Sequence, residues 1–580
     1  MAVLGVDVGG TFTDAVLLDS GRVTTAKVLT AAHQEESVVA AARAAGATGN
    51  VERFAHGTTV ATNALLERKG ARTAFVTNAG FEHLLHMRRQ TRAQLYRPCA
   101  AWPEPLVPLE RSHGVRGRMG PKGELEPLDL GTLPAIDAEA VAVCLLHAYR
   151  DPAHEQALVE ELRRRLPDAH VVASHEVAPE FREYERASTT AADAYLGPVV
   201  VRYLRALSTA AAAAELPAPF VMRSSGGVAT PEEAAEHPAT ILVSGPAAGV
   251  VGAARLAALA GIENAIAFDM GGTSTDVCLI AGGRAERASE RSVAGLPIRL
   301  PTVDLHTVGA GGGSLVWTDA GGALRVGPQS AGANPGPACY GRGGAQGTVT
   351  DANLLLDRLP HELAGGVELD RRAAERTLAG VDPAAVVDVV NAEMLRALRV
   401  VSVERGHDPT DFALVAFGGA GPLHACELAD ELGIRTVLVP EAAGVLSALG
   451  LVASEERRDA VRSYLVPLAD AGELPREGEA DLRYTGQSFE LTLSLQETDL
   501  GEAFHRAHQE QYGFAERDRE VQLVAVRTAD IRKGPELVLP RGEERTITGP
   551  AVIELAGSTC WIPPGWVGAR DGRMLRLTRQ

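Results

Sequence analysis

Short apolar runs that lead into glycine-rich polar turns recur along the chain, and two of these segments are closely alike. Residues 5–18 read GVDVGGTFTDAVLL, and residues 267–280 read AFDMGGTSTDVCLI. An apolar run precedes each turn, Val3–Val6 in the first copy and Ala265–Phe268 in the second, and another apolar run follows it. This pattern predicts a strand, a tight glycine turn and a second strand, which together make a β-hairpin.

The two turns match position by position. The matching residues are Asp7, Gly9, Gly10, Thr11, Thr13 and Asp14 in the first copy, and Asp269, Gly271, Gly272, Thr273, Thr275 and Asp276 in the second. One such turn on its own is equally well explained as an ordinary hairpin turn, because aspartate and glycine are common turn residues. Two matched copies far apart in the chain indicate a duplicated binding device instead.

Each turn carries residue types suited to a metal and a phosphate group. Asp7 and Asp269 lie at strand ends, where a carboxylate can hold Mg²⁺ through water. Consecutive glycines let the backbone approach a ligand, and their N–H groups converge on an anion. We expect Asp14 and Asp276 to orient the threonines or act as a base, or else to cap the turn. The residues predicted to bind phosphate are Gly9, Gly10, Thr11, Thr13, Gly271, Gly272, Thr273 and Thr275.

A third glycine-rich turn follows the apolar run Ala413–Phe417. Gly418 and Gly419 come directly after this run, and a helix is predicted to start near Pro422, since proline suits the first helical turn. Glycine at such a strand-to-helix turn permits close approach of a flat ring. Gly-rich turns of this kind are common, so the signal is weak alone and gains weight from the duplicated turns.

A threonine pair precedes a predicted helix at Ala61–Arg68. Thr58, Thr59 and Asn63 are candidates to donate to a phosphate or a substrate carbonyl at the helix N-terminus. The alternative is ordinary N-capping of the helix.

Composition and charge narrow the functional classes. The chain has 580 residues, 46% of them hydrophobic and 22% charged, and a net charge of −18, which disfavours binding to nucleic acid or an anionic membrane. We find no apolar run long enough to span a bilayer and no signal peptide, so a cytoplasmic protein is expected. GKS and GKT are absent, which excludes a P-loop. The six cysteines form no CxxC pair, so neither a zinc module nor a disulfide framework is predicted.

The three glycine-rich elements resemble the nucleotide-binding elements of the actin, hexokinase and heat-shock chaperone superfamily. Further characteristic stretches, besides the two turns and AFGGAGPLHA at 416–425, are HGTTVATNALLERKG at 56–70, RRQTRAQLY at 88–96, SHEVAPEFREYERASTT at 174–190, SGPAAGVVGA at 244–253, VGAGGGSL at 308–315, SAGANPGPACYGRGG at 330–344, TVTDANLLLDRL at 348–359, DLRYTGQSFEL at 481–491 and GPAVIELAGSTCWIPPGW at 549–566. Together these stretches resemble the ATP-dependent hydantoinase/oxoprolinase family, specifically its A-type, ATP-binding subunit, and N-methylhydantoinase-like members in particular.

The resemblance implies an α/β fold. Two duplicated actin/hexokinase-like (ribonuclease H-like) half-domains would surround an ATP cleft, with a small β-rich C-terminal domain added. We expect the half-domains at 1–195 and 196–455 and a reduced C-terminal domain at 456–580, since the stretches between 455 and 481 and after 532 look short for the family. ATP and Mg²⁺ would be the cofactors, and Gly418 and Gly419 would pack under the adenosine.

The resemblance also implies an activity. Family members use ATP to open a cyclic amide or imide such as a hydantoin, 5-oxoproline or another lactam. A phosphoryl group on the amide oxygen makes that oxygen a good leaving group and the carbon electrophilic. A separate B-type subunit is the expected partner, in a hetero-oligomer. Two alternatives stay open: the ATP-binding subunit of an acetone- or acetophenone-type carboxylase, and a non-enzymatic, ATP-switched chaperone or activase.

Four further residues are candidates for substrate binding. Arg89, Arg92 and Tyr96 lie on a predicted loop-helix segment and suit an anionic substrate group, although a solvated basic face explains them equally well. His306 precedes a glycine run and is a candidate for proton transfer or metal binding, against the common case of a structural histidine. Cys339 has no base beside it in the sequence, and we interpret it as a loop residue.

Overall fold

The computed structural model describes residues 2–363 and 367–580, and its first half is organised around one twisted sheet. Its strand order is β28-β27-β29-β26-β11-β10-β4-β1-β2-β3. The strands β1, β2 and β3 are antiparallel neighbours, and β4 and β10 continue the sheet parallel to β1. These five strands are β1 (Ala2–Val8), β2 (Phe12–Asp19), β3 (Arg22–Leu29), β4 (Val51–Gly57) and β10 (Pro219–Met222).

A second sheet repeats this plan. Its order is β14-β13-β12-β24-β25-β34-β33-β30, with β19 also paired to β13, and β24 and β25 run parallel to β12. The strands are β12 (Ala265–Met270), β13 (Thr275–Ala281), β14 (Arg284–Ala285), β19 (His306–Val308), β24 (Ala413–Phe417), β25 (Thr436–Pro440), β30 (Arg545–Thr548), β33 (Trp566–Arg570) and β34 (Met574–Arg579). The order β3-β2-β1-β4-β10 thus matches β14-β13-β12-β24-β25, which confirms the predicted duplicated α/β architecture.

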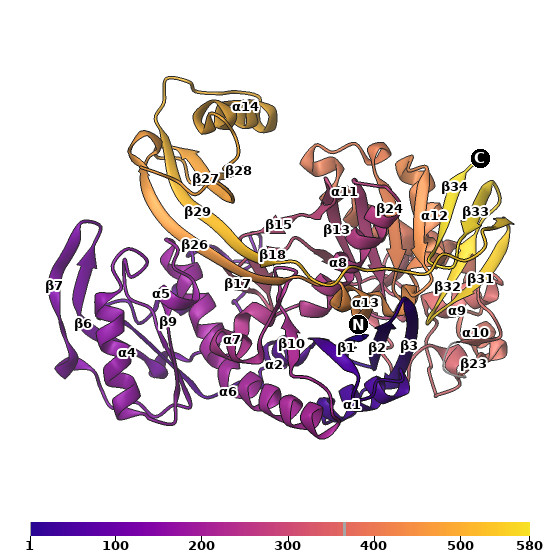
Figure 1. The fold of residues 1–580 in the computed structure, drawn as a ribbon, viewed down its shortest axis with the longest axis horizontal. Coiled ribbons are helices and arrows are strands. Elements are labelled where there is room, and N and C mark those ends of the chain that lie inside the picture. Colours follow the sequence, from indigo (N-terminus) through magenta and orange to yellow (C-terminus); the bar gives the residue numbers. More distant parts are fainter. Residues whose placement is uncertain (1, 364–366) are drawn as a thin grey trace.

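The helices cover the two sheets and join them (Figure 1). They are α1 (Gln34–Ala44), α2 (Val60–Leu66), α3 (Leu84–Met87), α4 (Ala153–Arg165), α5 (Ser174–Val177), α6 (Glu183–Ala213), α7 (Pro231–Glu236), α8 (Ser244–Leu259), α9 (Val349–Leu355), α10 (Arg371–Thr377), α11 (Pro383–Val401), α12 (Gly421–Leu432), α13 (Leu446–Val452) and α14 (Leu500–Tyr512). The predicted helices at Ala61–Arg68 and near Pro422 correspond to α2 and α12. Of the helices in the described ranges, none combines the length and the apolarity that a membrane span needs.

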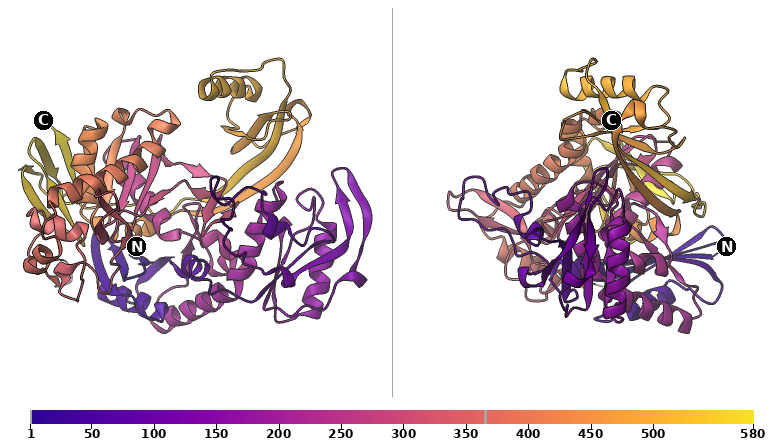
Figure 2. Two further views of the ribbon diagram at one scale, coloured as in Figure 1. Left: turned by 180° about the vertical axis from the view of Figure 1, so that it is seen from behind. Right: turned by 90° about the vertical axis from the view of Figure 1, so that its left-hand side faces the viewer.

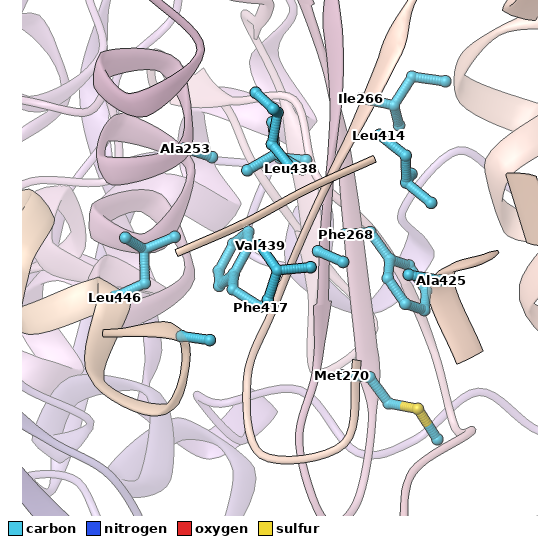
Figure 3. Close-up of a cluster of buried hydrophobic side chains, with 14 of the residues drawn as sticks. Ala253, Ile266, Phe268, Met270, Leu414, Phe417, Ala425, Leu438, Val439 and Leu446 are labelled. Carbon is cyan, nitrogen blue, oxygen red and sulfur yellow. The ribbon is translucent and has the colours of Figure 1, made fainter. Parts of the chain in front are cut away.

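Two helices, α8 and α13, cross between the sheets. Glycine makes their close approach possible, because a Cβ added at Gly450 of α13 would overlap the carbonyl oxygen of Ala248 of α8. A single hydrophobic core joins Ala248 and Leu446 of these helices to Phe268 and Phe417 of the second sheet and Val3 of the first. Figure 3 shows part of this core around Phe268, Phe417 and Leu446. The two half-domains therefore share apolar packing at their centre.

A third, five-stranded sheet is inserted into the first half, between α2 and α6. Its order is β7-β6-β5-β8-β9, and it projects from the sheet of β1–β4 (Figure 1). Its strands are β5 (Thr73–Asn78), β6 (Ser112–Gly120), β7 (Gly123–Asp129), β8 (Ala140–Val143) and β9 (His170–Ala173). The predicted limit between residues 195 and 196 lies inside the 31-residue helix α6, and β10, which follows it, belongs to the first sheet.

The range 456–580, predicted as one C-terminal domain, contributes to both large sheets. Strands β26 (Glu456–Pro467) and β29 (Val521–Arg532) form a long antiparallel arm that joins the first sheet at β11 (Val228–Ala229). The arm carries β27 (Glu479–Tyr484), β28 (Leu491–Ser494), α14 and a small core of its own. The chain then returns to the second sheet, where β34 pairs with β25. Each part adds strands to the edge of one of the large sheets. A strand at a sheet edge has unpaired N–H and C=O groups, so a further strand can pair with it.

Figures 1 and 2 show the arm with α14 rising away from the large sheets, while β30–β34 lie at the other end of the molecule. The remaining strands form two-stranded antiparallel pairs. They are β15 (Arg287–Ala288) with β18 (Thr302–Val303), β16 (Arg291–Val293) with β17 (Leu296–Ile298), β20 (Ser314–Thr318) with β21 (Leu324–Ser330), β22 (Glu362–Leu363) with β23 (Val367–Glu368), and β31 (Ala551–Leu555) with β32 (Ser558–Ile562).

Candidate functional site

The two matched turns have the same local structure. In the first, the Gly9 N–H donates to the Phe12 carbonyl at 2.9 Å, and in the second the Gly271 N–H donates to the Ser274 carbonyl at 3.1 Å. Asp7 on β1 lies directly opposite Asp14 on β2, as Asp269 on β12 lies opposite Asp276 on β13. Directly opposed side chains of an antiparallel pair lie on the same face of the sheet. Each turn therefore places two carboxylates side by side.

The carboxylates of the two turns act on one another. Burial, and then the charge of Asp14, raises the pKa of Asp7 from an ordinary 3.8 to about 7. Burial, and then the charge of Asp276, raises the pKa of Asp269 to about 8, with smaller contributions from Asp7 and Asp14 in the other half. Burial also raises the pKa values of Asp14 and Asp276. The carboxylates of the first turn thus lie close enough to Asp269 in the second half to raise its pKa.

The region around these carboxylates fits a hard divalent cation. Asp7 Oδ1 is buried and has no hydrogen-bond partner among the described residues. A Cβ added at Gly245, in the first turn of helix α8, would lie 3.4 Å from both carboxylate oxygens of Asp7. In the described part of the chain, no three histidine, cysteine or acidic side chains form a preformed metal cluster. Mg²⁺ commonly uses one or two carboxylates and completes its shell with water and phosphate oxygens.

The third glycine turn lies against the second matched turn. The Ala420 N–H donates to the Met270 carbonyl at 2.9 Å, and a Cβ added at Gly418 would overlap Asp269 Oδ1. Gly418 has φ +79°, which glycine adopts without strain. Ser558 of β32 donates through Oγ to the Gly418 carbonyl at 2.8 Å. The turn predicted to lie under adenosine is thereby fixed beside a predicted metal-facing carboxylate.

The glycine run at 309–313 supports the second turn. The Gly312 N–H donates to the Gly271 carbonyl at 3.0 Å, and the Gly313 N–H donates to the Gly272 carbonyl at 2.7 Å. A Cβ added at Gly311 would lie 2.6 Å from the backbone nitrogen of Thr273. Glycine is required here because two backbones meet, and the consecutive glycines are the sequence signal of this contact.

The threonine pair lies between β4 and α2. Ser244, at the start of α8, donates through Oγ to the Thr58 carbonyl at 2.9 Å, and Thr58 is buried. Thr59 occupies the position before α2 but makes no side-chain capping hydrogen bond; its Oγ1 accepts from Asn63 Nδ2 at 3.3 Å. The neighbouring residue His56 is buried, and burial lowers its pKa to about 4, so it is neutral near pH 7.

The other substrate candidates have the following surroundings. Arg89 donates from Nε and Nη2 to the Glu185 carboxylate at 2.7 and 2.8 Å, so its charge is matched within the chain. Arg92 makes one long contact, 3.4 Å, to the Leu95 carbonyl, and the Tyr96 side chain is 92% exposed. His306 lies on β19, which pairs with β13 of the second turn. Substrate contacts by these four residues stay predictions.

In each turn, the second aspartate is contacted by one side chain that the sequence did not single out. Lys27 of β3 lies with Nζ 2.5 Å from Asp14 Oδ1. Thr307 of β19 donates through Oγ1 to Asp276 Oδ1 at 2.5 Å, and Arg291 donates to Thr307 Oγ1 at 3.0 Å. The two turns are therefore alike in their backbones but differ in the side chain that contacts the second aspartate, a lysine cation in the first and a neutral hydroxyl in the second.

The comparisons with known proteins decide the family. Residues 3–166 match the hydantoinase/oxoprolinase N-terminal region, and residues 186–460 match hydantoinase/oxoprolinase. Caprolactamase subunit alpha of Pseudomonas jessenii is 34% identical over 97% of both chains. The chain belongs to the hydantoinase/oxoprolinase family. The structure of this chain is similar to that of the ATP-dependent caprolactamase from Pseudomonas jessenii, with a TM-score of 0.86, 32% identity and complete coverage of both chains.

Two further relatives of this hydantoinase/oxoprolinase chain bear on its activity. 5-Oxoprolinase 1 of Arabidopsis thaliana is 33% identical over 87% of this chain and 46% of its own length. The gamma subunit of acetophenone carboxylase from Aromatoleum aromaticum is 34% identical over 77% of this chain and 67% of its own. These similarities confirm the resemblance found in the sequence and the duplicated fold. They also confirm that the chain belongs to a family of ATP-dependent cyclic-amide enzymes.

Proposed function

We propose that this chain is the ATP-binding subunit of an enzyme that activates and opens a cyclic amide. The observation that supports this most strongly is the similarity to caprolactamase subunit alpha along the entire chain, turns included. Asp7 and Asp269, one in each matched turn, would supply the metal-holding carboxylates that such a reaction needs for ATP.

The chain's own residues would act by positioning and charge. The N–H groups of Gly9–Thr11 and Gly271–Thr273 would hold the phosphate oxygens of ATP from two sides. Asp7 and Asp269 would hold Mg²⁺ through water, and the ion when bound would neutralise charge on the phosphates. Thr58 would aim a hydroxyl toward the transferred group or the substrate carbonyl.

This arrangement would transfer the terminal phosphoryl group of ATP to the oxygen of the cyclic amide. The bond between the terminal phosphorus and ADP breaks, ADP leaves, and a new O–P bond forms to the amide oxygen. The phosphorylated oxygen no longer takes part in ordinary amide resonance, so the carbon becomes open to attack. We propose that a B-type subunit completes the reaction. Support comes from the relatives whose names describe subunits, and from the plant 5-oxoprolinase, of which this chain matches less than half.

ADP release is the direct test. The chain is assayed with ATP, Mg²⁺ and a panel of ε-caprolactam, 5-oxoproline and hydantoin, alone and together with a B-type subunit. We expect at least one cyclic amide to raise ADP release above the rate without substrate. The proposal fails when none does so under either condition.

A ketone carboxylase is the second candidate, favoured by the 34% identity to the acetophenone carboxylase gamma subunit. ATP turnover that requires both bicarbonate and a ketone such as acetone or acetophenone would select it. Turnover with a lactam in the absence of bicarbonate would instead select the hydrolase.

A further inference from the structure

A row of opposed residues crosses the first sheet at the turn. Asp7 on β1 lies opposite Gly57 on β4 and opposite Asp14 on β2, and Asp14 in turn lies opposite Lys27 on β3. Laterally paired residues of neighbouring strands share a face, so the side chains of Asp7, Asp14 and Lys27 lie in line on one face of the sheet.

The second sheet contains the corresponding row. Asp269 on β12 lies opposite Phe417 on β24 and opposite Asp276 on β13, and Asp276 lies opposite Thr307 on β19. Lys27 and Thr307 therefore occupy equivalent places, one in each half. The first half has a cation directly in the row, whereas the second has a neutral hydroxyl with Arg291 behind it.

Lys27 lies where the half-domains meet. A Cβ added at Gly557 would be 3.2 Å from Lys27 Cε, and the same glycine lies against Gly444, which belongs to the second half. The ammonium is 5.2 Å from the centre of the Phe12 ring, and its side chain is 29% exposed. The side chain of Lys27 therefore lies beside Gly557 and Phe12 and is still partly exposed to solvent.

The ammonium has unused hydrogen-bonding capacity. It carries three N–H donors, and its ion-pair partner among the described residues is Asp14, whose Oδ1 lies 2.5 Å from Nζ. Its charge also lowers the pKa values of Asp7 and of Asp269 in the other half, so it acts on both turns. Among the ion pairs of the described residues, the one between Lys27 and Asp14 is the only one that includes an aspartate of the turns.

We propose that Lys27 binds the phosphate chain of ATP, with Asp14 holding its ammonium in place. This inference rests on the proposed ATP site. It gives the first turn the cation that a P-loop lysine supplies elsewhere, since this chain has no P-loop. It also makes the two turns unequal: the first would bind phosphate by charge, and the second by backbone and hydroxyl donors.

Lysine labelling tests this in the unmodified protein. The chain has only four lysines, Lys27, Lys69, Lys122 and Lys533, so each can be followed separately by peptide mass spectrometry after a pulse of an amine-acetylating reagent. We expect Mg²⁺-ATP and Mg²⁺-ADP to slow acetylation of Lys27, by about tenfold or more if a charge-assisted hydrogen bond forms, while adenosine does not. Lys69 is a matched control, because it is also ion-paired, with Glu67 at 2.7 Å, but is 74% exposed.

Binding by variants gives the second test. Lys27→Met should weaken ATP and ADP binding by about tenfold to a hundredfold, the range for a lost bond to a charged group, and leave adenosine binding unchanged. Lys27→Arg should restore part of the loss, and Lys69→Met should bind all three ligands as the parent does. Calorimetric titration supplies the dissociation constants.

The outcomes separate this inference from the proposed function. If ADP binds in the titration while Lys27 is acetylated at an unchanged rate, Lys27 does not contact phosphate and the inference is overturned with the ATP site intact. Equal weakening of ADP and adenosine by Lys27→Met would also overturn it, since that pattern indicates a structural role. If neither ATP nor ADP binds to the parent protein or its complex, the proposed function itself fails.

Discussion

Gly57 and Asp7 are in direct contact across neighbouring strands: a Cβ at Gly57 would overlap Asp7 Oδ1. The carboxylate of Asp7 can lie where it does only because the opposing residue has no side chain. The second half has a related contact that is displaced by one residue: Phe417 lies opposite Asp269, and a Cβ at the next residue, Gly418, would overlap Asp269 Oδ1. The two metal-facing candidates therefore each depend on a neighbouring residue that has no side chain.

Gly57→Ala should impair activity more than stability. The added methyl meets the far end of a side chain, which can move aside, so the fold is retained while the Asp7 carboxylate is displaced. A displacement of this kind near the reacting groups costs about a hundredfold in kcat. ATP turnover at varied Mg²⁺ concentration measures the effect.

Gly131→Ala is the matched control, because it also brings a methyl near an aspartate, Asp129, whose Oδ1 would lie 3.1 Å from the added Cβ. It lies outside the site and should leave turnover unchanged. Parent-like kinetics for Gly57→Ala would contradict a role for the position of Asp7.

Asp269→Asn should abolish Mg²⁺-dependent turnover with the fold intact. The amide keeps the size of the side chain but removes the charge that would hold the cation, and loss of such electrostatic stabilisation costs about a hundredfold or more. ADP release and the thermal melting curve are measured together, with Asp319→Asn in the β20–β21 hairpin as the control. Near-normal turnover in a folded variant removes Asp269 from the site.

The contribution of Asp7 and Asp269 to the stability of the protein without nucleotide should fall as pH rises from about 4 through about 8. In that window the folded state holds protons on Asp7 and Asp269, whose pKa values of about 7 and about 8 exceed the 3.8 of the unfolded chain. Because the folded state then binds more protons, the free energy of unfolding falls with rising pH.

Urea unfolding in the absence of divalent cations measures this slope. Asp269→Asn should be the more stable protein at about pH 8 and should show a shallower slope than the parent, because it removes one buried titrating carboxylate. Parallel curves for the parent and the variant would show that Asp269 does not titrate in this range.

Ser558→Ala should raise the KM for ATP with little change in kcat. The hydroxyl bonds the Gly418 carbonyl, and loss of a neutral hydrogen bond costs about 1 kcal/mol, or about a fivefold change in KM if the turn binds the nucleotide. Ser402→Ala also removes a buried serine bond to a carbonyl, that of Leu398 at 2.7 Å, and should leave KM unchanged. An unaltered KM in Ser558→Ala would exclude an effect of β32 on nucleotide binding.

Glu180→Gln should destabilise the contact between the arm and the body. Glu180 is 1% exposed and accepts from Arg299 at 2.9 Å and from Arg527 of β29 at 3.0 and 2.7 Å. Breaking a buried charge network costs about 3–5 kcal/mol, which chemical denaturation would detect. Glu67→Gln removes an exposed pair and should change little; an equal response in both variants would contradict a special role for Glu180.

Local sequence was sufficient for the elements of the site. The D-x-G-G-T-x-T-D pattern predicted both hairpins, since a glycine turn between two apolar runs depends on neighbouring residues alone. The helix after Gly419 was predicted for the same reason. The sheet pairing of residues 456–580 was harder to predict. Which sheet a strand joins depends on which sheet edge is open, and the local sequence does not indicate this.

The sequence by itself determined the duplication, the family and the residues of each turn. Only the tertiary structure decided which distant residues complete them: Gly57 beside Asp7, Lys27 beside Asp14, Thr307 beside Asp276 and Ser558 on Gly418. Strand register and packing bring these partners together, and neither depends on spacing along the chain. The chemistry of each turn is therefore local, whereas its charge balance is a property of the fold.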